Sequence, residues 1–306
     1  MRVSRLFWAA FCAPALTTTL ILGCADKPPD KAPPSKSGNA APTMDSGSKS
    51  TGEKTPVDAT ATATIKGKVV YDGTPPTPES LVKVMTEHQD HDMCLAGDTK
   101  NPLWIVGADK GVENVVVWVR APEGKYLKTP DKLQARTDKV KMDQPHCAFE
   151  PHVVAFSPTF YDAASKKQKK TGEIFDVLNS SPKNHNTTWS GNRLFNSGDN
   201  KIIASKTDYV IDGAPSKPDA VGGEDLLNIS CDIHKWMTAK AAVFDHPYYA
   251  VTNAKGEFEI KDVPAGSELV LCVWHESMDP SSLKGAKKEN ITLKAGETKV
   301  EDIKIK

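Results

Sequence analysis

The sequence has no excess of charge of either sign. Across 306 residues, 39 Lys and Arg side chains balance 39 Asp and Glu side chains. Nucleic-acid-binding proteins need a basic patch against the phosphate backbone, so this balance argues against a nucleic-acid partner. The chain also lacks a Gly-rich phosphate loop, a Ser-His-Asp pattern and a zinc-protease motif. The sequence therefore gives no support for an enzyme.

Helical periodicity is also missing. No long segment repeats apolar residues every three or four positions, and short β-branched runs are separated by turn signals such as DG, NAKG and PAG. The runs include TIKGKVVY, VENVVVWVRA, EIFDVLN, LLNISC, KAAVFD, EFEI, ELVLCVWH and KVEDIKI. This pattern predicts an all-β protein built from antiparallel sandwiches rather than from a parallel α/β sheet.

Residues 1–23 have the pattern of a secretory signal. Arg2 and Arg5 precede the mostly apolar LFWAAFCAPALTTTLIL, and a glycine stands directly before Cys24. Pro14 and three threonines interrupt the apolar run, which disfavours a permanent transmembrane helix. The stretch ILGC resembles a bacterial lipobox, and this resemblance implies that Cys24 is lipidated and becomes the mature N-terminus. The alternative is an ordinary signal peptide with an incidental cysteine.

Large apolar side chains are nearly absent from residues 24–60. From residue 25 onward this segment holds six prolines and no aromatic residue, and only Met44 and Val57 are large and apolar. Such a composition cannot bury enough surface to offset the entropy lost on ordering, so a disordered tether is predicted. We therefore expect an exported protein that a lipid anchors to a membrane, facing the periplasm or the cell surface.

The C-terminal residues 246–306 resemble the carboxypeptidase regulatory-like fold, a small transthyretin-like β-sandwich. The resemblance rests on VTNAKGEFEIKDVPAGSELVLCVWHE followed by ITLKAGETKVEDIKI. Earlier, ATIKGKVVYDGTPP and GVENVVVWVRAP resemble the first two strands of the same fold. This implies one sandwich made from residues 61–123 and 246–306, with residues 124–245 inserted between them. A tandem order of two domains is the alternative.

Four cysteines remain once the signal and the lipidation site are set aside. Exported thiols that can pair usually do, and Cys94 and Cys147 both lie in polar, loop-like surroundings. We therefore predict a disulfide between them, worth roughly 4 kcal/mol in the chain-entropy model. Cys272 lies in ELVLCVWH, where both alternating faces are apolar, which predicts a buried and unreactive thiol. Cys231 is left unpaired, and an unpaired exported cysteine needs a chemical explanation.

The stretch CDIHKWM, residues 231–237, holds a thiol, an imidazole and a thioether. Its Cys-x-x-His-x-x-Met spacing is similar to the ligand loop of cupredoxins, the blue copper proteins, and above all to the amicyanin and plastocyanin type. The same family carries a His-Asn pair earlier in the chain, and EIFDVLNSSPKNHN supplies His185 and Asn186. The resemblance implies a cupredoxin-like Greek-key sandwich over residues 124–245.

The resemblance further implies a type 1 copper that cycles between Cu(I) and Cu(II). His185, Cys231 and His234 would be the equatorial ligands and Met237 the axial one. The amide of Asn186 would hold the cysteine loop in place. The expected function is single-electron transfer with a redox protein such as a cytochrome or a dehydrogenase. The rival function is copper storage or delivery, or a surface-structural lipoprotein, without electron transfer.

Several alternatives for metal binding stay open at this point. His146 and His152 flank Cys147 in QPHCAFEPHVV, and His152 could replace His185 as a ligand. Zinc is the competing metal, although zinc sites rarely recruit methionine. His88 and His91 precede Cys94 in EHQDHDMC and could bind a second metal.

Overall fold

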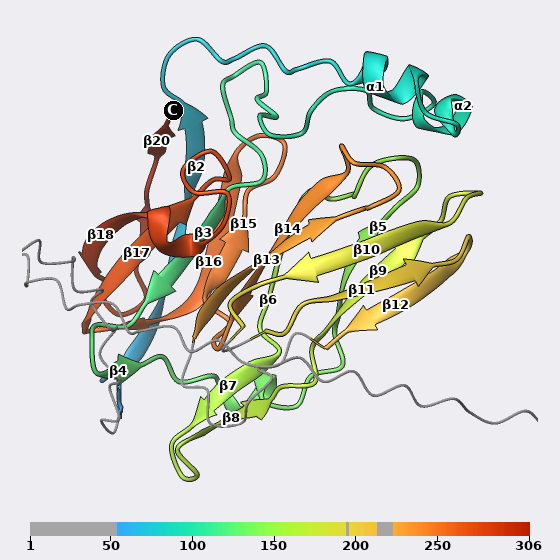
Figure 1. Cartoon of the computed structure of the whole chain (residues 1–306). Helices are drawn as coiled ribbons and strands as arrows, with labels where there is room; N and C mark the ends of the chain where they lie inside the picture. Colours follow the sequence, from blue (N-terminus) through green and yellow to red (C-terminus); the bar gives the residue numbers. More distant parts are fainter. Residues whose placement is uncertain (1–53, 194–195, 213–222) are drawn as a thin grey trace, which may run out of the picture. The chain divides into compact units, whose positions relative to one another are not determined.

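The computed structural model describes residues 54–193, 196–212 and 223–306 (Figure 1). The signal, Cys24 and most of the expected tether lie outside the described residues. Strands dominate what is described, so the all-β class predicted from the sequence is confirmed. The helical segments are Val82–Thr86 (α1), His91–Cys94 (α2) and the 3-10 turns Asp131–Leu133 (η1) and Leu283–Gly285 (η2). In this part of the chain no helix is long and apolar enough to cross a membrane.

The first sandwich is formed by strands from both ends of the described chain. One sheet has the order β15-β3-β17-β18, and the other has the order β16-β2-β19 with β20 also paired to β2. The strands are β2 (Ala61–Tyr71), β3 (Val116–Arg120), β15 (Tyr249–Val251), β16 (Glu257–Ala265), β17 (Glu268–Trp274), β18 (Lys287–Thr292), β19 (Thr298–Val300) and β20 (Ile303–Ile305). Strands before residue 121 therefore share sheets with strands after residue 248.

The second sandwich is formed by residues between β3 and β15. Its sheets have the orders β11-β10-β13-β14-β6 and β12-β9-β5. The strands are β5 (Lys139–Asp143), β6 (Val153–Phe156), β9 (Ile174–Asn179), β10 (His185–Ser190), β11 (Asp199–Ile203), β12 (Thr207–Ile211), β13 (Glu224–Ser230) and β14 (Thr238–Phe244). Two smaller pairs complete the fold: β1 (Thr55–Pro56) with β4 (Lys125–Tyr126), and β7 (Thr159–Asp162) with β8 (Lys167–Lys170).

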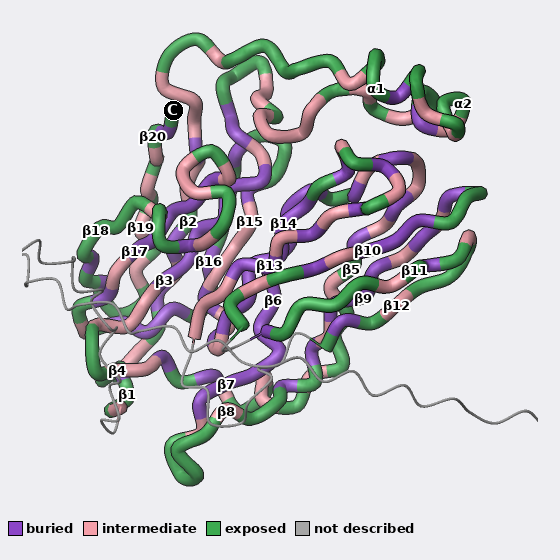
Figure 2. Tube along the Cα trace, viewed as in Figure 1, coloured by how far each residue is buried: buried purple, intermediate pink, exposed green. Residues whose placement is uncertain are grey.

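Alternation along the strands explains how the two sandwiches pack together. Val117 and Val119 of β3 belong to the first core, whereas Trp118 between them belongs to a separate buried cluster. In β14, Ala241 belongs to the second core and Phe244 to that same separate cluster. This interface cluster consists of Val116, Trp118, Val153, Leu226, Ala242, Phe244, Cys272, Trp274 and Leu283. Since neighbouring side chains point to opposite faces, β3, β17 and β14 are buried on both sides and have mostly apolar sequences (Figure 2).

Cys272 lies in the interface cluster. It is a free cysteine with no exposed surface. Burial raises the pKa of its thiol to about 12, so almost no thiolate forms near neutral pH. Since the thiolate is the reactive form of cysteine, the structure agrees with the buried, unreactive thiol expected from the sequence.

A buried ion-pair network crosses the boundary between the sandwiches. Glu276, which follows β17, lies 3.2 Å from Lys240 Nζ of β14 and 2.8 Å from His152 Nε2. Lys240 Nζ also donates hydrogen bonds to Asn228 Oδ1 and to the Pro280 carbonyl, each at 2.7 Å. Burial opposes ionisation of Glu276. Its contacts with His152 and Lys240 outweigh burial and lower the pKa of this carboxyl group.

The folded body begins earlier than the sequence predicted. Thr55 N donates to the Gly124 carbonyl at 3.0 Å, and β1 thereby pairs with β4. Val57 N donates to the Tyr126 carbonyl at 2.9 Å, and the Val57 side chain is buried in the first core. The folded part of the chain therefore includes residues 55–57, which the sequence analysis assigned to the tether. Composition does not reveal this, because the stabilising contacts come from a distant strand.

Glu276→Gln is expected to lower the free energy of unfolding by about 3 kcal/mol, because removing one partner leaves the buried Lys240 charge poorly compensated. Denaturant unfolding near neutral pH measures this change. The control is Glu268→Gln at an exposed carboxylate that forms no ion pair within the described residues. It should change the free energy by less than about 0.5 kcal/mol, and equal effects of both substitutions would contradict a role for the network.

Candidate metal centre

Two imidazoles and one thiol converge in the second sandwich. The Nδ1 atoms of His185 and His234 are 3.1 Å apart. Cys231 Sγ lies 4.0 Å from His185 Nδ1 and 3.8 Å from His234 Nδ1. All three residues are buried, with at most 1% of their surface exposed. The structure thus brings the three predicted equatorial ligands within reach of a single ion.

Two neighbouring strands and one turn place these ligands. β10 and β13 are antiparallel neighbours, and His185 is the first residue of β10 while Cys231 directly follows β13. Both residues therefore lie at the same end of these two strands. The turn that leads into β14 is closed by hydrogen bonds from Cys231 N to the Met237 carbonyl (3.1 Å) and from Met237 N to the His234 carbonyl (2.9 Å). This closure brings His234 back beside the thiol.

Met237 is the predicted axial ligand. Only 1% of its surface is exposed, and it belongs to the same buried cluster as Cys231. Its thioether is therefore shielded from water at the end of the turn that carries two of the other ligands. The axial role itself stays a prediction.

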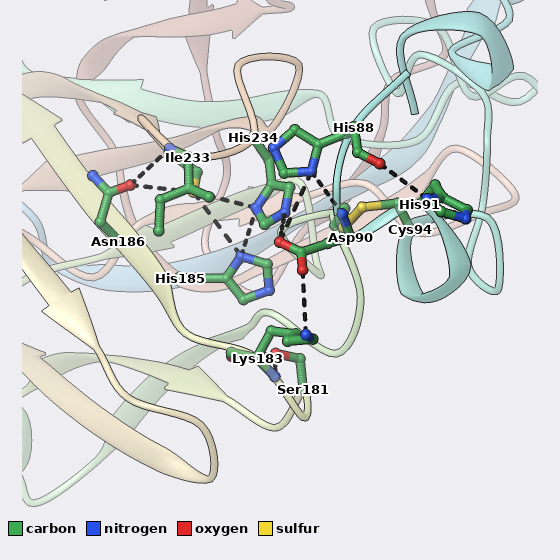
Figure 3. Close-up of polar contacts among 12 residues, drawn as sticks. His88, Asp90, His91, Cys94, Ser181, Lys183, His185, Asn186, Ile233 and His234 are labelled. Atoms are coloured by element: carbon green, nitrogen blue, oxygen red, sulfur yellow. Dashed lines mark hydrogen bonds and ion pairs between the residues drawn. A yellow bond between two sulfur atoms is a disulfide. The ribbon is translucent and has the colours of Figure 1, made fainter. Parts of the chain in front are cut away.

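Asn186 fixes the loop that carries the thiol (Figure 3). Its Oδ1 accepts hydrogen bonds from Asp232 N at 2.6 Å and Ile233 N at 3.2 Å, and lies 3.2 Å from Cys231 Sγ. Its Nδ2 donates to Asn200 Oδ1 at 3.0 Å and to Asp232 Oδ2 at 3.1 Å. One side chain therefore ties the start of β10 to the ligand turn, which is the position expected for a residue that keeps ligands rigid.

The surroundings of both imidazoles favour the neutral form. Burial, together with the nearby His234 ring, lowers the pKa of His185 to about 4. Burial and the nearby His88 ring also lower the pKa of His234, and this outweighs the opposing effect of Asp90. A neutral imidazole keeps a free lone pair on one nitrogen, which metal binding requires. The two rings are thus ready to bind a metal at neutral pH.

Part of the β2–β3 connection, residues 82–94, lies over the outer side of His234; we call it the covering segment (Figure 3). Asp90 Oδ2 is 3.4 Å from His234 Nε2, and Asp90 Oδ1 is 3.4 Å from Lys183 Nζ. The His88 ring centre is 4.6 Å from that of His234. A carboxylate beside Nε2 favours the tautomer with its proton there, which leaves Nδ1 free to face an ion. The first sandwich thereby helps to orient a ligand of the second.

A disulfide ties the covering segment to the second sandwich. Cys94, the last residue of α2, is bonded to Cys147, the pairing that the sequence predicted. Trp236 Nε1 donates to the Cys147 carbonyl at 3.2 Å, so the crosslink also contacts the ligand turn. His88, Cys94 and His234 form a second group whose ligand atoms lie within 4.8 Å of one another. Its sulfur is engaged in the disulfide.

The remaining histidines considered above do not join the centre. His152 pairs with Glu276 at the boundary between the sandwiches. The ring of His91 is about half exposed, and its Nδ1 lies 3.1 Å from the His88 carbonyl oxygen. Among the described residues, no group of convergent His, Cys, Asp and Glu ligand atoms includes His91, His146 or His152. The structure therefore gives no support to His152 as a replacement ligand or to a second site that uses His91.

Asp90 is the residue that sequence reasoning missed. It lies in EHQDHDMC, far along the chain from the ligands that it approaches. The sequence offered one indication of its role: Asp90 lies between two histidines and four residues before Cys94, which bonds to Cys147 of the second sandwich. Its distance from His234 depends on how two separate parts of the chain pack.

Comparison of the chain with protein-family models, characterised proteins and solved structures gives no match. The choice of ion therefore rests on the donors alone. They are two imidazoles with lowered pKa values and one thiol, with a thioether in the same turn.

Asn186→Ala is expected to weaken metal binding about 10- to 100-fold, because the cysteine loop loses its fixed acceptor. A competition titration with a coloured Cu(I) chelator measures the affinity. Asn184→Ala is the control: Asn184 Oδ1 accepts a hydrogen bond from Ser205 N at 3.0 Å and does not touch the ligand turn. Equal losses in the two variants would show that the loop contacts are not the cause.

The metal-free protein should lose stability as the pH falls from about 6.5 to about 4. The ordinary pKa of histidine is 6.5, whereas that of folded His185 is about 4. Between these values only the unfolded state takes up the proton, so acid favours unfolding, and the stability is complete above pH 6.5. Denaturant unfolding at stepped pH measures this. His185→Gln should flatten the curve in this window, and His91→Gln at the exposed ring should leave its slope unchanged.

Proposed function

We propose that this chain is a type 1 copper protein of the cupredoxin class. It is exported, anchored to a membrane through a lipid on Cys24, and carries single electrons between redox protein partners. The observation that supports this is the convergence of His185 Nδ1, His234 Nδ1 and Cys231 Sγ within 4.0 Å in a buried site. A thiolate and two imidazoles form the ligand set of blue copper. Copper would supply a one-electron change of oxidation state, which the protein's own side chains do not offer here.

The spacing of the donors fits a single ion. Bonds of about 2.0 Å to nitrogen and about 2.3 Å to sulfur can span the observed separations of 3.1, 3.8 and 4.0 Å. His185, Cys231 and His234 would hold the ion, with the Met237 thioether in the same turn. Zinc sites rarely recruit methionine, whereas a thiolate, two imidazoles and a thioether are the donor set of a copper site. The donor set therefore favours copper over zinc.

Strand pairing supports the proposed family. Strands within residues 61–123 share sheets with strands within 246–306, as an inserted domain requires. The chain between them, residues 124–245, supplies all four candidate ligands. We therefore propose a cupredoxin domain inserted into a transthyretin-like sandwich.

Copper handling without electron transfer is the second candidate function. The observation that favours it is the covered outer edge of His234, which lies beside Asp90 and His88 and has no exposed surface. An electron carrier exchanges electrons fastest through a ligand edge that its partner can approach. A storage or delivery protein would instead bind Cu(I) preferentially and cycle poorly between oxidation states.

The copper-loaded mature chain is expected to show the intense colour of a thiolate–copper bond. Cys231→Ser should abolish this colour, because the absorbing bond is lost. Met237→Leu should keep the colour and raise the reduction potential, because a weak donor to Cu(II) is removed. Visible spectroscopy and voltammetry measure these effects. Cys272→Ser is the matched control, since it removes the other free thiol from a site outside the centre.

The same measurements separate the two candidate functions. Copper-loaded wild-type protein that stays colourless and cannot be cycled by mild oxidant and reductant would rule out the carrier. A large loss of Cu(I) affinity in Met237→Leu, together with irreversible voltammetry, would indicate copper handling.

A further inference from the structure

A cavity of about 490 Å³ lies where the covering segment meets both sandwiches. Its walls include Met85 of α1, Trp104 from the loop before β3, and Phe149 from the loop before β6. The cavity extends to Trp236 and Met237 of the ligand turn. Its volume falls within the range of about 300–1,000 Å³ that is typical of small-molecule sites. It therefore has room for a small organic molecule beside the candidate metal centre.

Contacts on both sides of the cavity hold its aromatic walls in place. The Trp104 ring stacks on His275 with 4.0 Å between ring centres, and Tyr71 packs edge-on at 5.0 Å. On the other side, the hydrogen bond from Trp236 to the Cys147 carbonyl fixes the second indole. Walls that are already ordered bind an aromatic ring at little cost in conformational entropy.

Two adjacent polar side chains in the cavity wall have no partner of their own. Asn114 is 6% exposed, and its side-chain amide makes no hydrogen bond within the described residues. In that part of the chain the half-buried Glu113 carboxylate also forms no hydrogen bond or ion pair, and burial raises its pKa. Both side chains line the cavity, so their polar atoms are open to a molecule inside it. An acceptor and an amide without partners, side by side in an aromatic cavity, fit a ligand with hydrogen-bond donors.

The charges around the cavity disfavour an anion. Asp98, Glu113 and Glu150 line it, and they outnumber the single cation, Lys100. A carboxylate or phosphate ligand would meet a net negative surface. A neutral molecule with hydroxyl groups would not.

We propose that this cavity binds a neutral hydroxyaromatic molecule of the phenol or hydroquinone class. Its ring contacts the aromatic walls, and its hydroxyl groups donate to Glu113 and Asn114. Binding itself does not depend on a metal. The role of the bound molecule does rest on the proposed function. A hydroquinone is a reducing molecule, and the cavity would hold it against the ligand turn of a one-electron centre.

Calorimetric titration of the metal-free mature chain tests the proposal with three matched probes: a dihydroxynaphthalene, its dimethoxy ether and the corresponding dicarboxylate. The diol should bind with a stoichiometry of one. The ether should bind roughly tenfold more weakly, because it has no hydroxyl group to donate to Glu113 and Asn114. The dicarboxylate should not bind, because it meets the acidic wall.

Glu113→Gln identifies the cavity as the binding site. It should weaken binding of the diol several-fold, because a hydrogen bond to a charged acceptor is lost, and should leave binding of the ether unchanged. The control is Glu123→Gln, which removes the same charge from an exposed position outside this cavity. It should leave binding of both probes unchanged.

Three outcomes would overturn the proposal: no binding of the diol, equal binding of all three probes, or equal effects of the two Gln variants. Because the test uses metal-free protein, any of these results leaves the copper site untouched. Conversely, failure to form a coloured copper centre does not alter the outcome of the titration.

Discussion

The packing of one sandwich against the other is the constraint on which the rest of the structure depends. Trp118 of β3 and Phe244 of β14 meet in the interface cluster with 5.5 Å between ring centres. Large aromatic side chains bury enough apolar surface to contribute several kcal/mol together. This contact fixes the β2–β3 connection relative to the second sandwich. Only then can the covering segment reach the ligands there.

Burial decides the chemistry of the candidate centre. Removing His185 and His234 from water lowers their pKa values, which favours the neutral rings that metal binding requires. The same burial would be costly for loop N–H groups without acceptors. Asn186 Oδ1 accepts two of these N–H groups and holds the thiol nearby. A dry site that keeps its donors fixed is suited to an ion that must change oxidation state without rearranging its ligands.

The covering segment links three features that are distant in the sequence. It brings Asp90 to the outer nitrogen of His234, its disulfide joins Cys94 to Cys147, and Met85 forms part of the cavity wall. Each feature requires residues from more than one part of the fold. The candidate metal centre of the second sandwich is therefore covered by a segment that connects two strands of the first.

Local patterns in the sequence were sufficient for the strands and for the ligand turn. Runs such as ELVLCVWH and KAAVFD form β17 and β14, because alternation of side chains is a property of neighbouring residues. Cys231 and His234 lie three positions apart, so a single closed turn brings them together. His185 required the spacing known from a family. The disulfide required the number of cysteines and the polar surroundings of Cys94 and Cys147.

Tertiary structure alone decided the remaining features. The pairing of Val57 with β4, the network around Glu276 and the position of Asp90 all join residues that are far apart in the chain. Composition and periodicity describe a residue and its neighbours. They do not say which strand lies beside it or what covers it, because that follows from how apolar faces are buried against one another. The sequence by itself determined the elements and the candidate ligands, and packing decided how these residues are enclosed.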